Sequence, residues 1–106
     1  MAHTAQGAVE TAHGLLGMFQ ADRERIARLG RIAPNALRVH AALQTRPVTT
    51  INDLCARCGI SYTTAARAVD ALASLAITRE ITGRERDRVF AYDAYLNLLN
   101  EGAQPI

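Results

Sequence analysis

The chain has 106 residues, which is enough for one small domain with an appendage and too few for two full domains. Its hydrophobic share of 49% and charged share of 21% exclude a natively disordered chain and predict a packed core. The net charge of +2 does not identify a partner, because nucleic-acid binders tend to carry a stronger basic excess.

The N-terminal part of the chain has the pattern of a long amphipathic helix. From residue 8 to about residue 29 there is no proline, and apolar residues recur at steps of three and four. A helix of this length is about 33 Å long, so its apolar stripe exceeds what a small domain covers. We therefore assign residues 1–33 to dimerisation or docking. The predicted dimer-interface residues are Val9, Ala12, Leu16, Phe19 and Ile26.

Arginines cluster near the end of this helix. They are Arg23, Arg25, Arg28 and Arg31. Pairs four residues apart, such as Glu24 with Arg28, suffice to explain them, so we interpret the cluster as solvated ion pairs.

Residues 34–75 predict a helix-turn-helix. A helix begins at Pro34, and a β-branched stretch at 48–51 precedes a short helix that Thr50 or Asn52 can cap. The sequence Gly59-Ile60-Ser61 then supplies a left-handed turn, a core contact and the N-cap of the next helix.

Beyond residue 76 the apolar period changes from 3.6 to 2, which indicates a β-hairpin. Its tip, residues 83–87, is polar and begins with glycine. Asp93 can cap a final helix. The fold class is therefore mainly α with a small β-wing, in which a long helix precedes a winged helix-turn-helix domain at residues 34–106.

Two parts of such a domain are candidates for contact with DNA. Ser61 caps the third helix, whose first exposed residues present themselves to a major groove, and the arginines of the wing can reach phosphates. A solvated polar face explains both features equally well, and Asp70 on the same side would repel phosphate. The predicted DNA-binding residues are Ser61, Tyr62, Thr63, Arg67, Arg84, Arg86 and Arg88.

The sequence gives weak support for disulfide, metal or catalytic chemistry. Cys55 and Cys58 form no disulfide framework and fit a reducing compartment. Zinc needs four ligands and His40 is the one further candidate nearby, so we predict no metal and no cofactor. His40 fits a partly buried helix position.

No apolar run reaches the roughly 20 residues of a membrane span, and the start lacks a secretory signal, so we expect a cytoplasmic protein with no membrane partner.

Four segments together are similar to a known protein family: AVETAHGLLGMFQADRERI (8–26), ALRVHAAL (36–43), REITGRERDRVFAYDAYL (79–96) and NEGAQPI (100–106). They resemble the C-terminal part of Fic-family proteins, and 81–96 is the most specific part of the match. The resemblance implies a helix and winged helix that follow a catalytic domain, which typically transfers AMP to a protein hydroxyl. The catalytic motif HPFxxGNGR has no counterpart here, so its histidine is not carried over and we expect no enzyme.

Two hypotheses from different classes follow. The first is a non-catalytic winged-helix module that binds double-stranded DNA and has a regulatory role, like the C-terminal domain of Fic-family proteins. The alternative is a protein-interaction or homodimerisation module that docks on a Fic-type catalytic domain without binding DNA.

Overall fold

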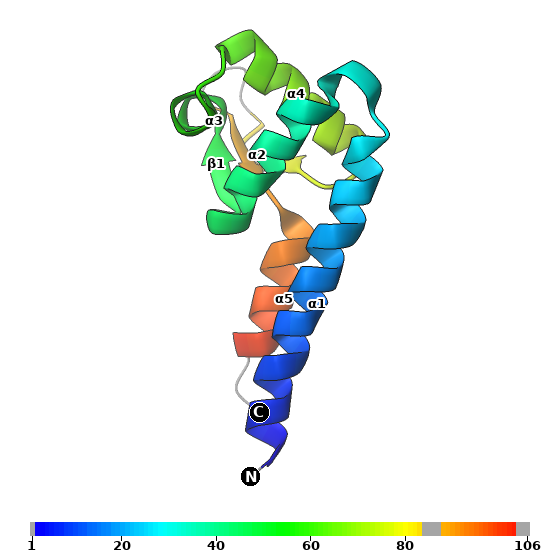
Figure 1. The fold of residues 1–106 in the computed structure, drawn as a ribbon. Coiled ribbons are helices and arrows are strands. Elements are labelled where there is room, and N and C mark those ends of the chain that lie inside the picture. The colour runs from blue at the N-terminus through cyan, green and yellow to red at the C-terminus, as the bar shows by residue number, and fades with distance from the viewer. Residues whose placement is uncertain (1, 84–87, 104–106) are drawn as a thin grey trace.

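The computed structural model describes residues 2–83 and 88–103, and the side chains of residues 13–83 and 88–100. Figure 1 shows a helical body at one end and a long pair of helices at the other. In chain order the elements are α1 (Ala2–Ala27), the 3-10 turn η1 (Gly30–Ile32), α2 (Ala33–Thr45), β1 (Val48–Thr50), α3 (Ile51–Cys58), α4 (Tyr62–Ser74), β2 (Arg79–Glu80), β3 (Val89–Ala91) and α5 (Asp93–Ala103).

The predicted fold class is confirmed: the chain is mainly helical, with a small antiparallel sheet. The three strands lie in the order β1-β3-β2, so the last strand is central. Ala91 pairs with Val48 on one side and with Arg79 on the other. The β2 strand is shorter than the alternation from Ile77 to Ile81 indicated, although the Ile81 N–H still donates to the Val89 carbonyl at 2.8 Å.

Local signals set the element boundaries. Thr50, one of the two predicted caps, accepts a hydrogen bond from the Asp53 N–H at 3.1 Å and starts α3. Pro34 lies in the first turn of α2, where its missing N–H costs nothing. Gly30 has a φ of +85°, a conformation that suits glycine, in the turn between α1 and α2.

The core lies between α2, α3, α4 and the sheet. Ala65 and Ala68 of α4 are fully buried, and their small side chains let α4 approach α2 closely. Leu43 of α2, Leu54 of α3 and Leu72 of α4 fill the remaining space and are also fully buried. Close packing of this kind fixes the orientation of α4 relative to the sheet.

The first helix belongs to the same core, which corrects part of the predicted dimer interface. Ile26 is fully buried and Phe19 is 8% exposed, and both pack within the core cluster of this chain. The two side chains are therefore covered by their own chain in this conformation, because α1 lies against α2 and α5 rather than projecting alone. Leu16 is 64% exposed. The side chains of Val9 and Ala12 lie outside the described residues.

A buried chain of hydrogen bonds joins α1 to α2 and the end of β3. The Tyr92 hydroxyl donates to the carboxylate of Asp22, which can only accept. The hydroxyl therefore accepts from Nε2 of His40, 2.9 Å away. Nδ1 of His40 is then left to accept from the Gln44 amide at 3.1 Å. This pattern assigns His40 the neutral form protonated on Nε2, and it places His40 deeper than the partly buried position that the sequence indicated.

Arg25 extends this network to α4. It donates to Asp22 at 3.2 Å and also to the backbone carbonyl of Leu75, at the end of α4. Asp22 thus has two partners, which offsets the cost of holding a carboxylate that is only 8% exposed. The predicted pair of Glu24 with Arg28 is not formed: among the described residues, the ion pair of this helix is Asp22 with Arg25.

The Tyr92 hydroxyl is expected to stabilise the fold measurably. Tyr92→Phe leaves the Asp22 carboxylate and the His40 N–H without their shared partner, so the free energy of unfolding should fall by about 1–3 kcal/mol in urea titrations. The matched control is Tyr95→Phe, which changes a neighbouring ring 5.9 Å away whose hydroxyl has no hydrogen bond among the described residues. Equal losses in the two variants would contradict the assigned network.

Burial lowers the pKa of His40 below its usual value near 6.5, and attraction to Asp22 opposes this only in part. The unfolded chain then binds a proton at higher pH than the folded chain does. His40 therefore contributes stability that is present above pH 6.5 and is lost as the pH falls below it. Urea midpoints at pH 7.5 and 5.5 should differ for the wild type and much less for His40→Gln, whereas His13→Gln, at an exposed position, should behave as the wild type.

Candidate nucleic-acid interface

The turn between α3 and α4 has the geometry that the sequence predicted. Gly59 adopts a φ of +67°, and its N–H donates to the Cys55 carbonyl at 2.9 Å. Ile60 packs against the core. Ser61 accepts from the Thr64 N–H at 3.2 Å and caps α4. The start of α4 is therefore fixed by local hydrogen bonds as well as by its buried alanines.

The outward face of α4 is polar and accessible. Tyr62 is 49% exposed, and Thr63, Arg67 and Asp70 are also exposed. Figure 1 shows α4 at the end of the molecule that lies away from the free ends of α1 and α5. The structure thus places Ser61 and the three helix residues predicted to contact DNA at the N-cap and in the first two turns of α4.

The ion pairs of the chain separate structural arginines from available ones. Within residues 13–83 and 88–100, carboxylates pair with Arg25, Arg46, Arg57 and Arg79. Arg67 has no such partner in that part of the chain. Its guanidinium can therefore bind an external anion without first breaking an internal ion pair.

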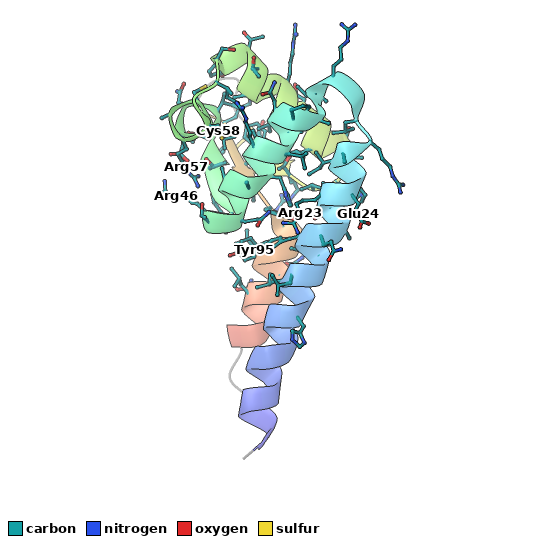
Figure 2. All side chains as sticks on the ribbon, in the orientation of Figure 1. Arg23, Glu24, Arg46, Arg57, Cys58 and Tyr95 are labelled. Atoms are coloured by element: carbon teal, nitrogen blue, oxygen red, sulfur yellow. The ribbon has the colours of Figure 1, made fainter. Side chains whose placement is uncertain are left out.

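A second polar cluster holds α3 against α2 and β1. Arg57 donates to Asp53 at 3.1 Å and to the Ala42 carbonyl at 2.7 Å, and Thr49 donates to Asp53 at 2.6 Å. The Thr49 hydrogen bond, together with the arginines nearby, lowers the pKa of Asp53. Figure 2 shows Arg57 and Arg46 close to β1 and α3. These groups satisfy one another, so the cluster orders the helix-turn-helix rather than offering a free site.

The base of the wing is organised by Glu80. Its carboxylate accepts hydrogen bonds from the N–H groups of Thr82 and Gly83 and from the Thr82 hydroxyl, and these bonds lower its pKa. Thr82 also accepts from the Val89 N–H at 3.3 Å across the hairpin. The Glu80 charge is thus used within the turn. Arg84 and Arg86, the wing residues predicted to contact phosphate, lie outside the described residues.

Two further wing arginines have different surroundings. Arg79 donates to Asp93 at 2.6 Å and ties β2 to the start of α5. Arg88 lies over the Phe90 ring, with its guanidinium carbon 5.4 Å from the ring centre. Its Nε atom is buried and finds no hydrogen-bond partner among the described residues. Of these two, Arg88 is the one that forms no ion pair within the described part of the chain.

A pocket beside α4 was not predicted from the sequence. It has a volume of about 380 Å³ and lies where η1 and the start of α2 meet α4. Arg31 and Arg67 reach it from these two parts of the chain. The lining residues are Arg31, Ile32, Asn35, Thr64, Arg67 and Ala71. No single sequence pattern marks it, because its two walls come from segments that are far apart in the chain.

Cys55, Cys58 and His40 do not gather into a metal site in the described part of the chain. Cys58 donates weakly to the Arg38 carbonyl at 3.7 Å, and burial raises the pKa of its thiol. A raised pKa leaves less thiolate for reaction or metal binding. Among the described residues no group of three ligand-type side chains is close enough to hold a metal ion.

The sequence matches no protein-family model, and no curated protein matches it either. The resemblance to Fic-family proteins therefore stays a prediction. In the described ranges, none of the helices combines the length and the apolar character that crossing a membrane requires.

The cap of α4 yields a stability prediction. Ser61→Ala removes the acceptor of the Thr64 N–H, so the free energy of unfolding should fall by about 1 kcal/mol. Ser74→Ala is the control, since that hydroxyl donates to the Ala71 carbonyl at the other end of the helix and caps no N–H. If Ser74→Ala destabilised the protein as much as Ser61→Ala in urea titrations, the Ser61 hydroxyl would not be acting as a cap.

Proposed function

We propose that this chain is a non-enzymatic, winged-helix module that binds double-stranded DNA through α4. The observation that carries the proposal is the accessible start of α4. There a capped helix offers Tyr62, Thr63 and Arg67 to solvent, and Arg67 has no carboxylate partner among the described residues. A helix about 10–12 Å across fits a major groove about 12 Å wide.

The proposal divides the interface into two roles. Tyr62 and Thr63, near the helix start, face base edges, and Arg67 lies one turn further along. The wing contacts the backbone through Arg88, with Arg84 and Arg86 as its predicted tip contacts. Asp70 opposes phosphate on the same helix, which makes the affinity modest and sensitive to salt.

The resemblance to the C-terminal part of Fic-family proteins supports a regulatory role for this module. Since the HPFxxGNGR motif has no counterpart, the module itself transfers no AMP. The two cysteines are free thiols, which is compatible with the reducing interior in which such a regulator would act, and we place the protein in the cytoplasm.

A second candidate function is protein interaction through the α1 and α5 pair. Leu16 is 64% exposed and Leu99 is 39% exposed, although both are large apolar side chains. A second copy of the chain or a Fic-type catalytic domain is the partner that this alternative would require. This function needs no contact with DNA at α4.

The deciding experiment is a titration of a 20-base-pair duplex at two salt concentrations. We expect log K to fall with log salt at a slope of roughly −3 to −4, because about three to five phosphates are neutralised. Arg67→Ala should weaken binding about fivefold or more. Arg23→Ala is the control, since Arg23 is an exposed arginine on α1 (Figure 2) and has no ion pair among the described residues.

Absence of binding at low salt and high micromolar protein would overturn the DNA proposal. If light scattering then showed a dimer of the wild type and a monomer of Leu16→Glu, the second candidate function would be supported.

A further inference from the structure

The pocket beside α4 concentrates positive charge from two separate elements. Arg31 comes from η1 and Arg67 from α4, and the described residues that line the pocket include no carboxylate. Arg31 is exposed and forms no ion pair in the described part of the chain. Two like charges that share a hollow of about 380 Å³ repel one another, and an anion bound between them removes that repulsion.

Two neutral donors complete the lining. Ser61 donates its hydroxyl hydrogen to Oγ1 of Thr64 at 2.9 Å, which leaves the hydrogen of Thr64 free for another acceptor. Asn35 contributes an amide from the first turn of α2. Among the described residues no side chain caps α2: Ile32 holds its N-cap position, and the Ala33 N–H donates to the Gly30 carbonyl.

The rest of the lining is apolar. Ile32 and Ala71 provide surface that an inorganic ion does not use but that a sugar ring can cover. A phosphate that is attached to a sugar therefore matches this pocket better than a free anion does.

The position of the pocket next to α4 identifies the source of such a phosphate. Thr64 and Arg67 belong both to α4 and to the pocket wall. A helix in the major groove is flanked on each side by a phosphate strand. The elements alongside α4 therefore meet one of these strands, and η1 with the start of α2 lies on one such side (Figure 1).

We propose that this pocket seats one backbone phosphate of duplex DNA between Arg31 and Arg67, with the neighbouring deoxyribose against Ile32 and Ala71. This inference rests on the proposed function. It assigns a phosphate contact to Arg31, whereas the sequence pattern indicated that Arg31 belongs to a cluster of solvated ion pairs at the end of the first helix. Because the contact is to the backbone, it contributes equally on different sequences.

The test compares Arg31→Ala with the wild type on two duplexes of unrelated sequence. The variant should bind both about five- to tenfold more weakly at low salt, and its salt slope should be smaller by about 1. Arg31→Lys should recover the slope, because it restores the charge. Arg23→Ala is the control and should leave both quantities unchanged. As an independent probe, Asn35→Asp adds a negative charge to the pocket. This variant should also bind DNA more weakly than the wild type does.

The outcomes separate this inference from the proposed function. Wild-type protein that binds DNA, with Arg31→Ala and Asn35→Asp equal to it, would overturn the phosphate site alone. Wild-type protein that binds no DNA would overturn both. A third arm adds inorganic phosphate without DNA. Saturable thermal stabilisation of the wild type, lost in Arg31→Ala while DNA binding is unaffected, would assign the pocket to a small anion and overturn the backbone contact.

Discussion

The Tyr92 hydroxyl joins three parts of the chain that are distant in sequence, and the remaining architecture depends on that junction. It contacts Asp22 of α1 and His40 of α2, while Tyr92 itself follows the central strand. A buried carboxylate without partners would be costly, so these contacts specify one position for α1 against the body of the protein. Arg25 carries the constraint onward to the end of α4, whose other end presents the candidate interface. The network thus specifies the position of α1 and links α1 to the end of α4, whose orientation the packed core also fixes.

Features that depend on neighbouring residues could be predicted from the sequence. The caps by Thr50 and Ser61 and the left-handed turn at Gly59 arise from contacts within a few residues, so residue type alone indicates them. The change of period after residue 76 likewise revealed a hairpin, because alternation is a property of the strand itself. The helical order and the hairpin followed from these signals, whereas the pairing of β1 with β3 did not.

Features that depend on distant partners could not be predicted. The spacing of Phe19 and Ile26 correctly indicated an apolar stripe, but spacing does not say whether the covering surface is a second copy or the same chain; here it is the same chain. The sequence did not indicate that Arg25 pairs with Asp22 in place of the expected pair of Glu24 with Arg28. The buried position of Asp22 depends on the Tyr92 hydroxyl, which is 70 residues away. The pocket lined by Arg31 could not be predicted for the same reason. Its two walls are distant in sequence, and each wall alone is an ordinary polar segment.

The antiparallel pairing of α1 and α5 has a practical consequence for attachment. Figure 1 shows the start of α1 and the end of α5 directed toward the same end of a molecule about 50 Å long, with α1 extending beyond α5, while α4 lies at the opposite end. A bead, fluorophore or fused protein attached at the start of α1 or at the end of α5 would therefore lie away from α4 and leave the approach to α4 unobstructed. Labels at both positions can be used together without covering α4. Immobilised and freely diffusing protein would therefore present the same face to a ligand.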